Sequence, residues 1–187
     1  LMLEEARVIL KQVETAKTGV QCRARGETGQ LIVASGVAIY LRPPIPRIIR
    51  EYGLKYPDII VAPQTNYSAL LTARLRAGQV DIAFIWRPVS DSDGLAIEPL
   101  EDEDLVVVLP AGHRLSNSTS VPLAALAEER FILFPRDLAP DPYDSLIAAC
   151  RRAGSSPALG QEAPEIVSAI PLVAAGLGVS IVPRSTS

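Results

Sequence analysis

The chain has 187 residues, of which 48% are hydrophobic and 21% are charged, and its formal net charge is −3. A chain of this length and composition can bury a core as one domain or as two small lobes, which argues against disorder. The negative charge is atypical of a nucleic-acid-binding domain, because such a domain needs clustered Lys and Arg for phosphate contacts.

The uncharged runs and the cysteines favour a protein of the reducing cytosol. The long uncharged run at residues 166–183 is interrupted by Pro171 and two glycines, whereas a spanning helix needs about 20 mainly apolar residues. The first residues, LMLEEARVILKQ, carry charges throughout and do not resemble a secretory signal. Cys22 and Cys150 are interpreted as unpaired thiols, with a redox pair as the less favoured alternative. We therefore expect a cytoplasmic protein without membrane contact.

The first segment is predicted to form a helix that pairs with another helix. Its apolar residues recur at intervals of four and three, and charged residues fill the positions between them. The apolar stripe consists of Met2, Ala6, Ile9, Val13 and Ala16 and continues to Val20. Packing of this helix against its own domain is the alternative. The glycine-rich segment GVQCRARGETGQ then indicates a hinge.

Short apolar runs next alternate with longer amphipathic segments. Three such runs predict strands, at residues 31–35, 59–63 and 80–86. The segments between them, PIPRIIREYGLKYP and SALLTARLRAG, predict helices. In the second helix Leu70, Leu71 and Leu75 are placed on one face, and Gly78 ends the helix. This β-α-β-α-β order predicts right-handed crossovers and a parallel sheet. Trp86 and Arg87 follow the third strand and are candidates to line the hinge between the lobes, but burial in the core is the favoured interpretation for Trp86.

An acidic stretch at residues 91–104 separates this set from a second one. It contains no basic residue and lacks the spacing of a calcium loop, so we interpret it as a solvated linker. The pattern then restarts, with strands predicted at residues 105–110, 130–135 and 179–182 and helices at 121–129, 141–154 and 165–176. The last strand is expected to be buried and parallel. Two α/β lobes joined by a linker form a cleft, where ligands bind beyond the carboxyl ends of the strands.

Catalytic chemistry finds little support in the chain. A serine nucleophile needs a nearby base and an orienting acid, and the single histidine, His113, is interpreted as a turn residue far from Ser35 and Ser68. The segment GLGVS follows a helix and precedes a strand, which is the reverse of a phosphate-binding fingerprint. We therefore expect no enzyme, no catalytic residue, no cofactor and no metal site.

The order and spacing of several short segments carry a family resemblance over nearly the whole chain. They include LEEARVILKQVE, PRIIREYGLKYPDI, LRAGQVDIAF, VVVLPAGHRL, FILFPR and PLVAAGLGVSIVP. Together they resemble the effector-binding region of LysR-type transcriptional regulators. The resemblance implies an α/β fold of two Rossmann-like lobes of the periplasmic-binding-protein type (type II), preceded by a linker helix used for dimerisation.

The same resemblance divides the chain into a linker helix and hinge (residues 1–26), regulatory lobe I (27–100) and regulatory lobe II (101–187). Family members also carry an N-terminal winged helix-turn-helix and a C-terminal return to the first lobe. Both parts are expected to lie outside the present sequence.

Candidate effector contacts in the first lobe lie at strand ends and helix starts. Ser35, Gly36 and Val37 follow the first strand, and they either contact an effector or simply end the strand and turn the chain. Asn66 or Ser68 is expected to cap the next helix, whose free amides suit a carboxylate. The resemblance implies that a hydroxyl at the position of Ser68 contacts the effector.

In the second lobe the candidates are Pro135, Arg136 and Ser168. Ser168 is placed in the first turn of a helix predicted to begin near Pro164. Arg136 is either a surface charge or a two-point partner for a carboxylate.

The function predicted from these features is effector sensing and oligomerisation in a LysR-type regulator. The expected partners are a small-molecule effector, a second or further copies of the chain in a homodimer or homotetramer, and DNA only through the N-terminal domain. The arginines and helix N-termini indicate a small carboxylate as effector, aromatic acids included. The alternatives are a solute-binding protein of a transporter and an enzyme on the same scaffold.

Overall fold

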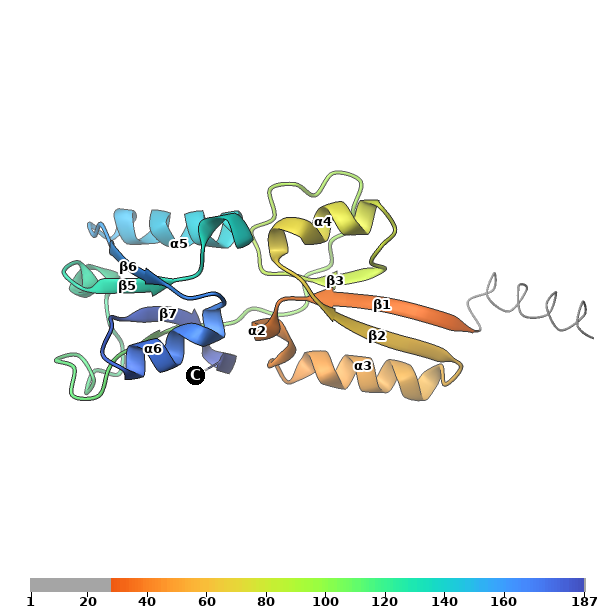
Figure 1. Cartoon of the computed structure of the whole chain (residues 1–187), viewed down its shortest axis with the longest axis horizontal. Helices are drawn as coiled ribbons and strands as arrows, with labels where there is room; N and C mark the ends of the chain where they lie inside the picture. The colour runs from red at the N-terminus through yellow and green to blue at the C-terminus, as the bar shows by residue number, and fades with distance from the viewer. Residues whose placement is uncertain (1–27, 187) are drawn as a thin grey trace, which may run out of the picture.

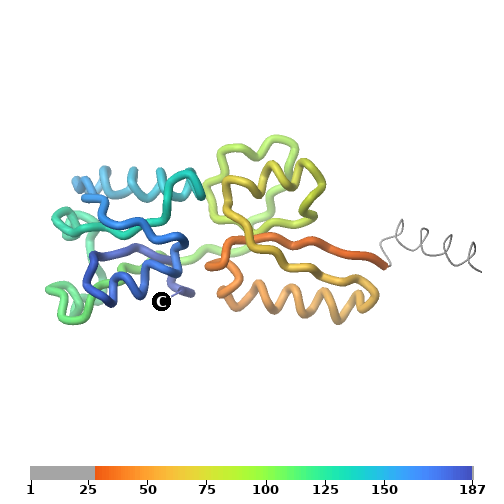
Figure 2. The backbone as a smooth tube through the Cα atoms, viewed as in Figure 1, coloured from red at the N-terminus to blue at the C-terminus, as the bar shows by residue number. Residues whose placement is uncertain are grey.

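A computed structural model describes residues 28–186, which form two α/β lobes side by side along the long axis of the molecule (Figure 1). We use lobe I for residues 29–84, crossover for 85–104 and lobe II for 105–186. The crossover passes over lobe I before it enters lobe II (Figure 2). The apolar stripe of the predicted dimerisation helix and Cys22 lie outside the described residues.

Lobe I is built on a parallel sheet. Its strands β1 (Gly29–Ser35), β2 (Ile59–Thr65) and β3 (Ile82–Phe84) lie in the order β2-β1-β3, and both pairings are parallel. The central strand β1 has the near-continuous apolar sequence LIVA because helices cover both of its faces. The predicted β-α-β-α-β order and parallel sheet are confirmed.

Three helices complete lobe I: α2 (Val37–Tyr40), α3 (Pro44–Lys55) and α4 (Ser68–Arg76). The longer two, α3 and α4, lie on opposite sides of the sheet (Figure 1). Leu71 packs with Ala34 and Val80 in the core, but Leu70 is 52% exposed. The prediction that both leucines share one buried face is wrong for Leu70, since consecutive helix residues point about 100° apart.

Lobe II contains β4 (Leu105–Val108), β5 (Arg130–Leu133), β6 (Ala158–Glu162) and β7 (Ser180–Pro183). Strands β5 and β6 are parallel, β4 and β7 are antiparallel, and a parallel bridge between Phe131 and Val179 joins the two pairs. The last predicted strand is buried as expected, but its extended pairing with β4 is antiparallel. The reason is that β4 enters lobe II from the crossover while β7 runs back toward it. Strand β6 was not predicted, because its residues are all exposed and show no apolar alternation.

The helical segments of lobe II are η1 (Leu123–Leu126), η2 (Arg136–Leu138), α5 (Pro140–Arg152), η3 (Ile166–Ser168), α6 (Ala169–Ala174) and η4 (Arg184–Thr186). The helix predicted at residues 165–176 is therefore a single 3₁₀ turn followed by a short α-helix. Pro171 explains the late start of α6, since a proline fits only the first turn, where no intrahelical N–H is required. No helix in residues 28–186 is long and apolar enough to cross a membrane.

Each lobe has its own hydrophobic core. In lobe II, Phe131 packs with Leu126 and Ile181, and a second cluster forms around Ile132 and Val173. Cys150 is buried in α5 and His113 lies in a turn, as predicted. The lobes contact each other where α4 meets η2 and where α2 meets η3. Relative motion of two parts that have separate cores is the general expectation, so we expect the lobes to move as bodies.

The crossover is exposed over most of its acidic stretch, as expected for a solvated linker, but some of its acidic residues pair with the lobes. Asp91 forms a two-point ion pair with Arg76 at 2.6 and 2.7 Å. Glu103 is only 7% exposed and pairs with Arg42 of lobe I. Its acidic residues therefore attach the crossover to the lobes.

Candidate functional site

A cavity of about 590 Å³ lies between the two lobes. It opens beyond the carboxyl ends of β1 and β2, where the chain leaves the parallel sheet at Ser35 and Thr65. Cavities of this size and at this place in parallel α/β sheets bind small molecules.

The lobe I wall of the cavity comes from the segments that follow the three strands. After β1, Gly36 and the start of α2 contribute. After β2, the wall includes Tyr67 and the first turn of α4, and after β3 it includes Trp86. Since these segments leave one sheet edge, the strand order β2-β1-β3 brings them together.

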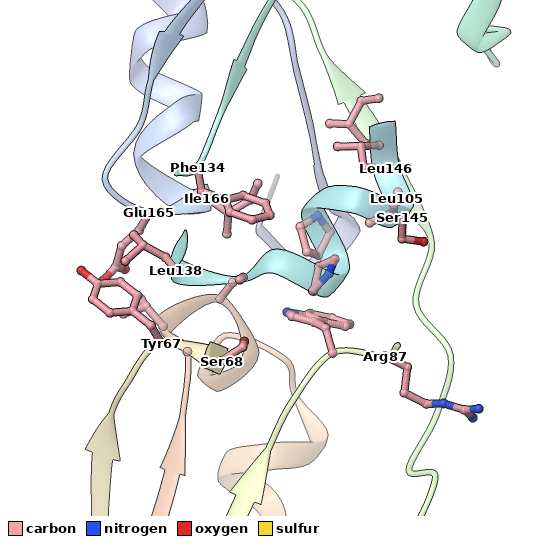
Figure 3. A pocket seen from close by; sticks show the side chains of 18 of the residues that line it. Tyr67, Ser68, Arg87, Leu105, Phe134, Leu138, Ser145, Leu146, Glu165 and Ile166 are labelled. Carbon is pink, nitrogen blue, oxygen red and sulfur yellow. The ribbon is translucent and has the colours of Figure 1, made fainter. Parts of the chain in front are cut away.

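The lobe II wall is mainly apolar. Phe134 and Ile166 lie above the cavity in Figure 3, and Leu105 and Leu146 lie toward its other side. Phe134 also packs edge-on against Tyr143, with ring centroids 6.0 Å apart. Apolar walls with few polar groups are typical of sites for small organic ligands.

Four of the predicted effector contacts line this cavity, namely Gly36, Val37, Asn66 and Ser68. They come from the two loops that follow β1 and β2. Their contact with an effector remains a prediction, and the structure supports it by placing them on one wall.

The other four candidates, Ser35, Pro135, Arg136 and Ser168, lie outside the lining. The Ser35 hydroxyl is buried and donates a hydrogen bond to the Phe84 carbonyl at 2.9 Å, which fits its alternative role as a strand end. Arg136 is exposed and paired with Asp144, which fits its alternative as a surface charge. Ser168 closes η3, and the cavity is lined instead by the preceding residues Pro164 to Ile166, because α6 begins at Ala169.

The helix start in lobe I also differs from the expected cap. The N-cap of α4 is Tyr67, and no side chain caps the helix, so the prediction that Asn66 or Ser68 does so is wrong. Ser68 is instead the first helical residue. Within residues 28–186 its hydroxyl and the side chain of Asn66 have no hydrogen-bond partner, so both are free to contact a ligand.

The two longer helices that begin at the cavity differ in their suitability for an anion. The first turn of α4 carries no acidic residue and no capping side chain. The Leu70 N–H donates to the Tyr67 carbonyl at 3.0 Å, which leaves the N–H groups of Ser68 and Ala69 available. The first turn of α5 contains Pro140 and Pro142, which lack N–H groups, and it also contains Asp141. The Asp141 carboxylate accepts hydrogen bonds from the backbone and hydroxyl of Ser90 in the crossover. A carboxylate therefore fits the lobe I side better than the lobe II side.

Charged side chains at the cavity are few. Glu103 is engaged by Arg42, and Arg87 turns away from the cavity in Figure 3. Glu165 lies on the same side as Tyr67, and in the described part of the chain its carboxylate has no partner. The sequence pattern does not predict Glu165 as a cavity residue, because it places Glu165 inside a helix at residues 165–176. The α-helix of this segment, α6, begins only at Ala169. Pro171 was the signal that could have corrected this.

Trp86 is a further correction. It was expected in the core, but it is only partly buried and lines the cavity. The guanidinium carbon of Arg42 lies 5.2 Å from the centroid of its ring, a cation–π contact. This contact joins residues 44 positions apart, so no local pattern predicts it.

The fold and the cavity define a two-lobed ligand-binding domain. Residues 24–187 match the family model described as LysR substrate binding domain, and the chain therefore belongs to that family. The predicted family and fold class are confirmed.

Two curated relatives illustrate the match. The HTH-type transcriptional regulator AlsR of Bacillus subtilis (strain 168) is 32% identical over 186 residues, which are 99% of this chain and 61% of that protein. The regulator TtuA of Agrobacterium vitis is 32% identical over 185 residues, covering 98% and 60%. The chain thus spans about three fifths of the length of these relatives, which are regulators and not transporter solute-binding proteins.

Solved structures agree with this assignment. The BenM effector-binding domain with its effector benzoate has a TM-score of 0.73 and is 27% identical, covering 84% of this chain and 71% of that one. Full-length BenM has a TM-score of 0.72 and is 25% identical, covering 95% and 59%. This chain has the effector-binding fold, and its cavity is the candidate effector site.

Proposed function

We propose that this chain is the effector-sensing part of a LysR-type transcriptional regulator and that the cavity between its lobes binds the effector. The observation that carries the proposal is the cavity of about 590 Å³ at the carboxyl edge of the lobe I sheet. The family membership and the regulator relatives support it. In this proposal the two regulatory lobes have the bounds predicted from the sequence, residues 27–100 and residues 101–187.

The proposed effector is a small carboxylate with an apolar or aromatic body. The carboxylate would lie at the free first turn of α4, near the hydroxyl of Ser68 and the amide of Asn66. The body would pack against the apolar wall that includes Trp86, Phe134 and Ile166. Benzoate, the effector of the structurally similar BenM, has this composition.

The proposed mechanism is a shift between two arrangements of the lobes. An effector that contacts both walls binds one arrangement more tightly and so increases its population. The helix predicted at the start of the chain would transmit the change within a homodimer or homotetramer. DNA would be bound only by a helix-turn-helix domain encoded upstream.

Thermal unfolding of the chain in the presence of matched ligands tests the effector class. A ligand that binds only the folded state raises the melting temperature with its concentration. We expect benzoate to do so and its neutral counterpart benzamide to have a smaller effect. A panel in which only neutral compounds stabilise the chain would contradict a carboxylate effector.

The coding sequence upstream of Leu1 tests the regulatory role. The proposal expects roughly 60 codons with a helix-turn-helix pattern. An export signal at that place would favour a transport protein instead.

A further inference from the structure

A buried cation lies where the crossover enters lobe II. Arg42 stands between α2 and α3, and its backbone belongs to lobe I: its N–H donates to the Ile39 carbonyl, and its own carbonyl accepts from Ile45 N–H, each at 3.1 Å. The Arg42 side chain is only 9% exposed. Burial of a guanidinium is costly unless its donors are matched by acceptors, so its partners define its role.

The anionic partners of Arg42 come from the end of the crossover. Nη2 donates to Glu101 Oε1 at 2.5 Å, and Nε lies 2.6 Å from Glu103 Oε2. The other oxygen of Glu103 accepts a hydrogen bond from the backbone N–H of Ser185 at 2.6 Å. Glu103 lies two residues before β4, and Ser185 lies two residues after β7, the strand that pairs with β4. The carboxylate of Glu103 is thus attached to lobe II.

Arg42 Nη2 also donates to the Asp102 carbonyl at 3.4 Å. A further partner of Arg42 is the ring of Trp86, at 5.2 Å from ring centroid to guanidinium carbon. Trp86 and Glu103 both line the cavity, whereas Arg42 does not. Arg42 therefore contacts two residues of the cavity wall without lining the cavity itself. Trp86 follows the last strand of the lobe I sheet, and Glu103 precedes the first strand of lobe II.

We propose that Arg42 is a positioning residue that couples occupancy of the cavity to the angle between the lobes. The coupling rests on the proposed effector function. A rotation that moves β4 away from lobe I separates Glu103 from the guanidinium. An effector packed against Trp86 keeps the ring, the guanidinium and Glu103 together. A contact made in only one lobe arrangement shifts the population toward that arrangement.

Distances between spin labels on the two lobes test this role without any ligand. Labels at Arg50→Cys in α3 and Arg152→Cys at the end of α5 report on the lobe angle, because both positions are exposed. Cys22→Ser removes one native thiol, and Cys150, 1% exposed, is protected from labelling. Pulsed dipolar spectroscopy on the whole chain then gives the distance distribution.

The test variants keep the buried charge balanced. The double variant Arg42→Gln/Glu103→Gln removes both members of the buried pair, so that no unpaired charge remains inside. Arg42→Lys keeps the charge but loses the planar fork that reaches two carboxylates. The control Arg47→Gln removes an exposed α3 arginine that pairs with Glu51. We expect a broader or shifted distribution in the double variant and in Arg42→Lys, and no change in the control.

A ligand titration provides the second readout, with benzoate as the probe. Trp86 is the single tryptophan of the chain, so its emission reports on the cavity. We expect benzoate to narrow the wild-type distance distribution and the double variant to bind benzoate about fivefold or more weakly, the lower end of typical coupling. The single variant Glu103→Gln measures how much of the change in benzoate affinity comes from Glu103 as a residue of the cavity wall.

The outcomes separate the coupling from the effector class. Identical ligand-free distributions in the wild type, the double variant and Arg42→Lys overturn the role of Arg42, whatever benzoate does. If the double variant fails to fold, the ligand-free distance distribution of Arg42→Lys is compared with that of the wild type, and identical distributions overturn the role of Arg42. If benzoate leaves the wild type unchanged, the carboxylate proposal fails, while the ligand-free comparison still decides whether Arg42 sets the lobe angle.

Discussion

The guanidinium of Arg136 forms a two-point ion pair with Asp144, with Nε 2.7 Å from Oδ1 and Nη2 2.5 Å from Oδ2. Both residues lie in lobe II outside the cavity lining, so Nε and Nη2 of Arg136 are engaged within their own lobe. The hydrogen bond from Arg136 is the main reason why the pKa of Asp144 lies below its ordinary value.

The first prediction concerns the pH dependence of this pair. Because the pKa of Asp144 is lower in the folded chain than in the unfolded chain, the pair stabilises the fold above the unfolded pKa. That contribution is lost as the pH falls through the folded pKa. We expect NMR of the Asp144 carboxyl carbon to show this low pKa, and Arg136→Gln to raise the pKa toward its ordinary value. Arg47→Gln is the matched control. An unchanged Asp144 titration in Arg136→Gln would refute the assignment.

The second prediction concerns Ser68. Its hydroxyl lines the cavity at the first turn of α4 and has no partner within the described residues. Loss of a hydrogen bond to a charged group costs about 1.5–3 kcal/mol, so Ser68→Ala is expected to weaken benzoate binding by about tenfold or more. Calorimetric titration measures the change. Ser118→Ala, at an exposed serine of a lobe II loop, is the control, and equal affinities for the two variants would exclude Ser68 as a ligand contact.

The third prediction concerns Glu165. This carboxylate lines the cavity without a counter-charge in the described chain, so it repels an anionic ligand. Partly exposed charges interact by roughly 0.2–1 kcal/mol. We therefore expect Glu165→Gln to tighten benzoate binding up to about fivefold and to leave benzamide binding unchanged. Weaker benzoate binding in this variant would instead indicate that Glu165 accepts a hydrogen bond from the ligand.

The fourth prediction compares two glycines between α6 and β7. A Cβ at Gly178 would overlap the backbone oxygen of Arg130, whereas a Cβ at Gly176 meets open space at a φ of +80°. Gly178→Ala is expected to destabilise the chain by about 3 kcal/mol, at the upper end for overpacking. Gly176→Ala should cost about 1–2 kcal/mol from backbone strain alone. Urea unfolding measures both, and equal midpoints would show that the close approach of Gly178 to β5 relaxes without cost.

The fifth prediction concerns the thiol of Cys150. Burial in α5 raises its pKa, which keeps the thiol protonated, and the thiolate is the reactive form. In a Cys22→Ser variant we expect iodoacetamide to react slowly with the folded chain and rapidly once urea unfolds it. The stability contribution of the neutral thiol is present below its unfolded pKa and is lost as the pH rises through the folded pKa. Rapid alkylation of the folded chain would contradict this burial.

Much of the lobe I fold could be predicted because its signals are local. The apolar run LIVA gives a strand that is buried on both faces, and Gly78 at a φ of +64° ends α4 as expected. Lobe II was less predictable. Strand β6 has no apolar pattern, and the direction of β7 depends on β4, a partner far away in the chain.

The part of the candidate site that could be predicted from the sequence is the part built by the loops that follow the strands of lobe I. The carboxyl ends of parallel strands meet at one edge, so Gly36 and Ser68 could be placed near the effector cavity from the order of elements alone. The sequence could not show that Ser35 turns inward to Phe84 or that Arg136 is used by Asp144, since both depend on side-chain partners.

The amino-acid order thus determined the family, the two α/β lobes and the sheet edge at which the candidate site lies, because hydrophobic periodicity and turn residues act over short distances. The tertiary structure alone decided that Arg42 contacts both Trp86 and Glu103. Their contacts span 44 and 61 positions and need a buried environment in which a guanidinium keeps its partners. Long-range packing of this kind leaves no periodic trace in the sequence.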